Sequence, residues 1–430
     1  MNKNIFAIIL IALSFSTILA QINDVNSYSR LHLQHNECSS IVGVNAGAYT
    51  GSNSLKNEFV NSFLTNSFID YDLKQSNNIH DKNYFGYKSQ INVYFSTLLD
   101  TMWGIASMGY KVSVNSLSYQ NMQFSRDFYN LAMYGNKMYE NKIADLSGLD
   151  VNYLTFQSVE FGLFKRFEEP TNGYHTLYLG LSFVKGQNYH YLYLDNGKIF
   201  TAPDGEFIDL EIKGAYFGSD SVSSNLLTVA GLGASLNFYW AYEDVKHNAR
   251  FEISFTELGL VSWYKNPLNY NADTTIRFEG VEVNNVLSST DNTYNEVSKD
   301  SVIETVFCNQ DNTTFNKALP KQFNISYTKI LLEKKYELTL GAGYIFNANQ
   351  FSPAFYVNNK VVLDPNFNLS LLVAYGGYSN FNLGLGTGFR IKKRFRGYVG
   401  TTNILGFLLP EKTYSQALYV SLAYTFGKNY

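Results

Sequence analysis

Residues 381–391, FNLGLGTGFRI, carry the pattern from which the fold of this chain can be predicted. Apolar or Thr side chains stand at every second position from Phe381 to Ile391, and Asn, Gly and Arg stand between them. A period of two is typical of a β-strand, because successive side chains point to opposite faces of a sheet. We therefore predict a strand with one apolar face and one small or polar face.

The same alternation recurs in residues 91–95, 177–183, 208–213 and 336–346. The alternating runs suit the roughly ten-residue strands that cross a bilayer at a tilt. A soluble β-sandwich also alternates, but its strands are usually shorter, and a face of glycines would make a poor packed core. The pattern therefore predicts an all-β protein whose apolar faces meet lipid.

The composition also favours a membrane barrel. Aromatic residues make up 16% of the chain, with 34 Tyr and 33 Phe against 3 Trp. Charged residues also make up 16%, which is below the usual level of about 25%. Such a chain suits a barrel whose aromatic side chains lie at the two lipid interfaces. The net charge of −3 gives no sign of the basic surface that binds nucleic acid.

The first twenty residues have the features of a signal peptide. Lys3 supplies a positive charge, residues 5–18 are mostly apolar, and Ala20 offers a small residue for cleavage. We expect a signal peptide at 1–20, a periplasmic or luminal segment at 21–40 and a barrel at 41–430. The predicted location is a Gram-negative type outer membrane. The expected partners are outer-membrane lipid and the barrel assembly machinery, with envelope proteins as further candidates.

The connections allow the strands to be counted. If the C-terminus is periplasmic, the short connections 333–335, 364–366 and 392–394 fall inside, and the long connections fall outside. We predict a transmembrane antiparallel β-barrel of about 14 strands. The alternative is 16, if 41–49 and 191–201 both span. Short helices are predicted within the long loops, at 56–68 and 126–137.

No motif in the chain indicates a metal site. His32, His35 and Cys38 have a ligand-like spacing, but no second ligand cluster follows, and a polar N-terminal segment explains them more simply. The cysteines are Cys38 and Cys308, and a disulfide between them stays an open alternative.

No motif indicates an enzyme either. His175, His190 and His247 lie in or beside predicted strands, yet no Gly-x-Ser-x-Gly element accompanies them. We therefore predict no catalytic residue, no metal and no cofactor.

Two charged patches are candidates for function. Asp209, Glu211 and Lys213 form a charged face of a predicted strand. On a barrel wall this face must point to the lumen, since a Lys or Arg facing lipid at mid-bilayer costs about 2–4 kcal/mol. These residues could tune solute selectivity or hold neighbouring segments by ion pairs. The basic residues of 390–396 are expected in a periplasmic turn, where a solvated turn or contact with anionic lipid headgroups would explain them.

Residues 124–128, Leu131, Gly135-Asn136 and 152–167 resemble a family of uncharacterised Bacteroidota-type outer-membrane barrels. That family is similar in architecture to FadL-like transporters of hydrophobic compounds and to PorV and PorP-like secretion accessories. The last strand, 418–426, resembles the closing strands that the assembly machinery recognises. FadL-like chains also imply an N-terminal luminal hatch, and their Asn-Pro-Ala element is absent here, where residues 44–47 read VNAG.

Two functions remain as hypotheses. The first is an outer-membrane channel or transporter for small hydrophobic or amphipathic solutes, working by facilitated diffusion. The alternative is a non-enzymatic scaffold or accessory of a secretion, motility or surface complex. A continuous lumen would favour transport, whereas a lumen blocked by inward side chains would favour a scaffold.

Overall fold

The computed structural model describes residues 40–169, 173–219, 228–279, 309–332, 335–346, 352–392 and 394–426. The expected signal peptide, residues 21–39 and both cysteines lie outside the described residues. No helix in the described part of the chain is long and apolar enough to cross a membrane.

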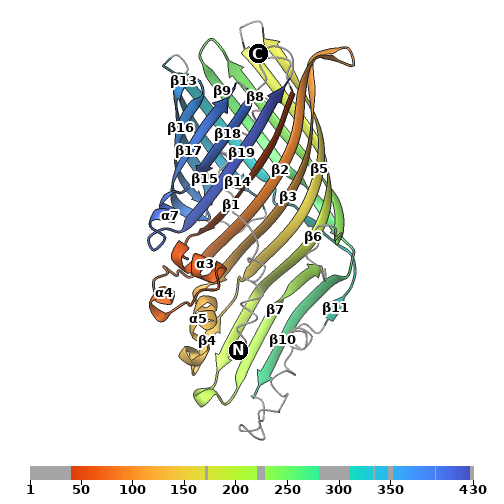
Figure 1. Ribbon diagram of the computed structural model, residues 1–430. Helices are drawn as coiled ribbons and strands as arrows, with labels where there is room; N and C mark the ends of the chain where they lie inside the picture. The colour runs from red at the N-terminus through yellow and green to blue at the C-terminus, as the bar shows by residue number, and fades with distance from the viewer. Residues whose placement is uncertain are drawn as a thin grey trace.

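Fourteen strands form a closed antiparallel barrel (Figure 1). Around the ring they are β1 (Ser40–Ser52), β2 (Lys82–Met102), β3 (Ile105–Ser125), β5 (Asp150–Glu169), β6 (Gly173–Thr201), β8 (Gly231–Asp244), β9 (Ala249–Trp263), β13 (Gln322–Leu331), β14 (Tyr336–Ile345), β15 (Ser352–Asp364), β16 (Phe367–Gly377), β17 (Ser379–Ile391), β18 (Phe395–Thr401) and β19 (Ser415–Phe426). Strand β1 pairs with both β2 and β19, which closes the ring. The predicted barrel of 14 strands is confirmed.

The 14-strand prediction left out residues 41–49 and 191–201, and the structure differs from it at the first of these segments. Residues 41–49 lie in the ring as part of β1, whereas 191–201 do not add a separate spanning strand. Strand β6 is 29 residues long. Its first part, 173–186, pairs with β8, and its last part, 190–201, pairs with β7 (Ile208–Ser219). The chain therefore leaves the barrel partway along β6.

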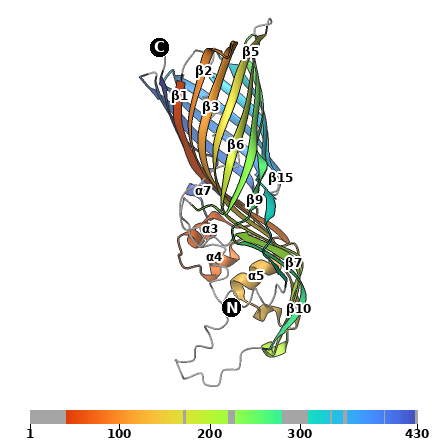
Figure 2. The same ribbon diagram turned by 90° about the vertical axis from the view of Figure 1, so that its right-hand side faces the viewer.

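The strands beyond the ring form a second region, which we call the sheet extension. It consists of the last part of β6 together with β4 (Lys142–Asp145), β7, β10 (Pro267–Phe278) and β11 (Asn309–Asp311). A further short strand, β12 (Phe315–Ala318), pairs with the end of β9. Figure 2 shows β7 and β10 curving away below the barrel.

The long connections lie at one end of the barrel, as predicted, and that end also carries the short turn at Tyr378 between β16 and β17 (Figure 1). The short turns at the opposite end include 103–104, 245–248 and 365–366. The end with the long connections carries α3 (Asn57–Leu64), α4 (Tyr71–Gln75), α5 (Arg126–Tyr134), the 3-10 turns η2 (Lys137–Tyr139) and η3 (Pro203–Gly205), and α7 (Leu405–Leu408). The helices predicted within 56–68 and 126–137 are confirmed as α3 and α5.

The outer surface of the barrel is apolar. On β6, Leu179, Leu181 and Phe183 are 57–60% exposed, while Ser182 and Val184 are buried on the opposite face. The residues that alternate in the sequence thus sort into an apolar outside and a largely polar inside. This arrangement is typical of a barrel wall that faces lipid.

Candidate functional site

The interior of the barrel carries a belt of hydrogen-bonded polar side chains. Ser421 donates to Asn45 (2.6 Å), and Asn45 donates to Asn92 (3.2 Å). The belt continues from Asn92 to Asn115 and from Asn115 to Ser158 (3.2 Å). Because each member lies on a different strand, the belt joins β19, β1, β2, β3 and β5 from within.

Charged side chains extend this network across the lumen. The carboxylate of Glu160 accepts hydrogen bonds from Lys111 (3.3 Å) and Asn237 (2.9 Å). Lys88 on β2 donates to the Gln322 side chain on β13 (2.9 Å), although several strands separate these two in either direction around the ring. Lys88 and Glu160 are both buried. Contacts between distant walls therefore bridge the lumen in this structure.

An aromatic cluster lies inside the barrel towards the end that carries the helices. The hydroxyl of Tyr119 on β3 lies 2.6 Å from that of Tyr378, in the turn between β16 and β17. Nearby, the ring centroid of Tyr189 lies 5.2 Å from that of Trp263 and 5.8 Å from that of Phe315. All five side chains are buried, so large aromatic groups occupy this part of the interior.

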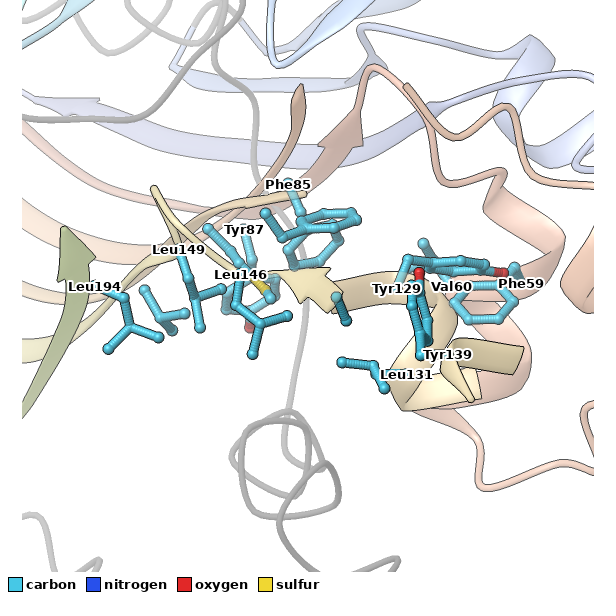
Figure 3. Close-up of a cluster of buried hydrophobic side chains, with 14 residues drawn as sticks. Phe59, Val60, Phe85, Tyr87, Tyr129, Leu131, Tyr139, Leu146, Leu149 and Leu194 are labelled. Carbon is cyan, nitrogen blue, oxygen red and sulfur yellow. The ribbon is translucent and has the colours of Figure 1, made fainter. Parts of the chain in front are cut away.

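A second hydrophobic cluster lies on the outside of the wall, beyond the lipid-facing band. Phe85 lies on the same face of β2 as the exposed Ile91 and Val93, yet it is buried, and it belongs to a cluster that includes residues of α3 and α5. We call these helices, with α4, the cap. In Figure 3 the cluster runs from Phe59 and its neighbours to Leu194.

Local sequence explains two of the helices in the cap, α3 and α5. In α3, Phe59, Val60 and Phe63 fall on one side, because residues three and four apart share a helix face. In α5, the Ser125 hydroxyl accepts from the backbone N–H of Phe128 (3.1 Å) and so caps the first turn. Gly135 ends this helix with φ +82°, a conformation that glycine adopts without strain.

The two helices meet through Tyr129. Its ring centroid lies 6.0 Å from that of Phe59. Its hydroxyl donates to the Lys74 carbonyl oxygen (2.7 Å) and accepts from the Asn77 side chain (2.9 Å). Burial raises the pKa of Tyr129 well above its ordinary value, so the phenol stays neutral at physiological pH.

Between the cap and the outer face of the wall lies a hollow, which we call the cap pocket. Its empty space is about 560 Å³, including the part open to solvent. Ten residues line it: Leu55, Phe59, Val60, Phe63, Phe85, Gln120, Met122, Phe124, Phe128 and Tyr129. None of these ten side chains carries a charge, and Gln120 and Tyr129 contribute the only side-chain polar groups. The pocket therefore suits an apolar molecule.

The charged face predicted to line the lumen lies elsewhere. Asp209, Glu211 and Lys213 are on β7, which belongs to the sheet extension and not to the ring. The barrel-wall position predicted for them is therefore corrected. They lie on the same face of the sheet as the inward side chains of β6, but beyond the ring this face meets solvent. The side chains of these residues and of their ion-pair partners are 29–76% exposed.

Each of these three residues has an oppositely charged partner on a neighbouring strand. Arg277 donates two hydrogen bonds to Asp209 (2.7 and 2.8 Å) and thereby lowers the pKa of that carboxyl. Two further pairs join β7 to its neighbours, Lys213 with Asp273 (3.1 Å) and Glu211 with Lys198 (3.9 Å). This arrangement fits the structural alternative, in which the charges hold adjacent strands together.

The histidines considered above all contact aromatic or acidic neighbours. His175 stacks on Tyr242 (4.7 Å between centroids) and accompanies Trp240 on the outer surface near the short turns, as expected of an interfacial aromatic belt. His190 bonds to Tyr216 (2.6 Å), and His247 lies in a short turn bonded to Asp244. Among the described residues, no group of three or more His, Cys, Asp and Glu is placed to hold a metal ion.

The described basic residues of 390–396 lie at the turn between β17 and β18, at the end with the short connections. That position agrees with the sequence-based topology. The cap pocket, by contrast, was not predicted. Its signal in the sequence is the outward register of β3, in which the polar residues Ser116, Ser118 and Gln120 follow Val112 and Val114 before the apolar face resumes at Met122 and Phe124.

Several solved barrels resemble this chain in overall architecture. The toluene transporter TodX of Pseudomonas putida is 7% identical, with 97% of this chain and 95% of that chain covered and a TM-score of 0.42. A Pseudomonas aeruginosa FadL homologue is 8% identical, with 92% and 91% covered and a TM-score of 0.40. The translocator domain of the autotransporter NalP from Neisseria meningitidis is 10% identical, with 94% and 96% covered and a TM-score of 0.34. At these identities the similarities say nothing about a ligand of this chain.

No curated protein matches the sequence. Residues 38–402 match a family described as a family of unknown function, DUF5723. Because this match spans most of the 430 residues, the chain belongs to the DUF5723 family.

Proposed function

We propose that the protein is a non-enzymatic outer-membrane transporter of small hydrophobic or amphipathic solutes, and that it binds them first in the cap pocket. The observation that carries this proposal is the uncharged lining of that pocket, in which eight of ten side chains are hydrocarbon or thioether. Transfer of an apolar molecule from water into such a lining is favourable, at about 25 cal/mol per Å² of buried apolar surface.

The position of the pocket supports the same proposal. The long connections, and therefore the cap, are expected on the outer side of the membrane, where an external solute arrives. The pocket lies on the outer face of β2 and β3, the face that continues into the exposed band with Ile91 and Val114. A solute leaving the pocket along this face would reach lipid without entering the lumen.

The alternative function is a scaffold for an envelope complex, and the bridged lumen favours it. The contact between Lys88 and Gln322, and that between Tyr119 and Tyr378, join opposite walls. The sheet extension adds a large surface beyond the barrel (Figure 2). A protein that only anchors partners needs no open path.

A substitution that fills the pocket can distinguish a transporter from a scaffold. Val60 lines the pocket, so Val60→Trp should occupy the hollow, whereas Phe68→Trp changes an exposed side chain in the same connection. We would measure binding of the apolar fluorophore N-phenyl-1-naphthylamine to the purified barrel, and uptake of a radiolabelled apolar solute by cells that carry each variant.

Transport predicts that Val60→Trp lowers both binding and uptake, while Phe68→Trp leaves both unchanged. Binding that is lost without any change in uptake would mean that the pocket is not part of a transport route. No binding to the unmodified barrel would refute the proposal, and a protein partner recovered in fixed stoichiometry with the barrel would then support the scaffold.

A further inference from the structure

One polar atom in the cap pocket has no partner. Gln120 is 3% exposed, and its Oε1 atom accepts no hydrogen bond among the described residues. Of the buried polar side-chain atoms without a partner in the described part of the chain, it is the one on a residue that lines this pocket. An unpaired buried acceptor is unfavourable, and such atoms call for an explanation in a folded protein.

The surroundings of Gln120 define what could satisfy it. The neighbouring lining residues Phe85 and Met122 carry no hydrogen-bond donor in their side chains. The one hydroxyl of the pocket, on Tyr129, already donates to the Lys74 carbonyl oxygen. The residues paired with Gln120 on the neighbouring strands, Tyr87 and Tyr153, carry hydroxyls, but neither donates to Oε1 in this structure. Oε1 therefore remains an acceptor for a donor on a molecule in the pocket.

We infer that the cap pocket selects apolar molecules that carry one hydrogen-bond donor, such as a phenol or an alcohol, and that Gln120 Oε1 accepts from that donor. This inference rests on the proposed function, since it names the class of solute that the pocket would take. The aromatic side chains of the lining provide the apolar part of the site, and Gln120 fixes the orientation. A small number of placed polar groups in an apolar pocket is the usual basis of ligand specificity.

The test compares three ligands of similar shape. 2-Naphthol has a donor, 2-methoxynaphthalene has only an acceptor, and 2-methylnaphthalene has neither. Their dissociation constants would be measured by displacement of N-phenyl-1-naphthylamine from the unmodified barrel, from Gln120→Met and from Gln120→Leu. Gln157→Met is the matched control, because Gln157 also lies on the outer face of a neighbouring strand but does not line the pocket.

The quantity of interest is the affinity of 2-naphthol relative to that of 2-methylnaphthalene. This ratio should fall about tenfold in Gln120→Met, equivalent to about 1.4 kcal/mol, and should not change in Gln157→Met. The ratio for 2-methoxynaphthalene should stay constant in all variants. Each ligand has its own free energy of transfer from water, and this contribution cancels when the ratio is compared between variants.

The outcomes distinguish a failure of this inference from a failure of the proposed function. If all three ligands bind but no ratio depends on Gln120, the inference is wrong and the proposed apolar site stands. If none of the three binds to the unmodified barrel, the proposed function itself fails. If Gln120→Met does not fold, as judged by circular dichroism, Gln120→Leu gives the same comparison. A loss of all three ligands to the same extent in both folded variants would show that Gln120 shapes the pocket without selecting a donor, which also overturns the inference.

Discussion

Replacing Phe59 by alanine tests whether packing on the outer wall holds the cap in place. Phe59 is 3% exposed and packs on Tyr129. Replacing a buried phenylalanine by alanine usually lowers the free energy of unfolding by about 3–5 kcal/mol. Because one side of Phe59 already borders the cap pocket, fewer contacts are lost here, and we expect about 2–3 kcal/mol. The loss should appear as local opening of the cap, since the barrel wall keeps its own hydrogen bonds.

Hydrogen exchange measures this opening directly. A loss of about 2–3 kcal/mol should speed amide exchange in Asn57–Leu64 roughly 30- to 150-fold, while the strand segment 173–186 exchanges as before. Phe68→Ala makes the same chemical change at a side chain that is 89% exposed, so it should leave both segments unaffected. If α3 exchanges at the same rate in Phe59→Ala and in the unmodified protein, the cap is not held by this packing, and the cap pocket loses its structural basis.

Three further predictions concern the wall, the lumen and the sheet extension. Leu181→Lys should destabilise the barrel by about 2–4 kcal/mol in urea unfolding from lipid vesicles, because the side chain faces lipid; Val245→Lys, in an exposed turn, should not, and equal effects would contradict the assignment of the outer face. Glu160→Gln should cost roughly 3–5 kcal/mol by leaving Lys111 without its counter-charge. Combining it with Lys111→Met should cost less than the single change, unless the pair makes no contribution. Arg277→Ala should raise the pKa of Asp209 towards the ordinary value of about 3.9, because Arg277 holds it below that value. The stabilisation from this pair is present above the ordinary pKa and is lost as the pH falls through the lowered one. Carbon-13 NMR of labelled aspartate would follow the titration, and an unchanged pKa would show that the pair does not form.

Sequence alternation predicted the strands well because it reports a local physical fact. Leu181 and Ser182 point to opposite faces of one strand, so their polarity in the sequence is enough to tell which of them faces lipid. The helices α3 and α5 were predictable for the same reason, since Ser125 and Gly135 mark the ends of α5 through local hydrogen bonding and backbone conformation.

The sheet extension was not predictable, because it depends on which strands are neighbours. Residues 208–213 alternate apolar and charged side chains, as a strand facing lipid and lumen would. In the structure the apolar face, which includes Ile212, packs towards the cap cluster instead of lipid. The charged face, with Asp209, meets solvent and the ion-pair partners instead of the lumen. One pattern therefore fits two environments, and only the pairing of β6 with β7 separates them.

The polar lumen and the apolar cap pocket favour different routes for a solute. Opening the lumen would separate Lys88 from Gln322 and break bonds of the Asn45 belt. Water can replace those bonds at moderate cost, but an apolar molecule offers none in exchange. A hydrophobic solute is therefore disfavoured in the lumen and favoured in the cap pocket, on the outside of the wall. Hence uptake of such a solute should depend on Val60, which lines the pocket, and should tolerate Gln322→Leu with Lys88→Met, which removes the polar bridge and adds apolar bulk to the lumen. Uptake that is instead lost on changing the bridge, while Val60→Trp has no effect, would place the route through the lumen and contradict this reasoning.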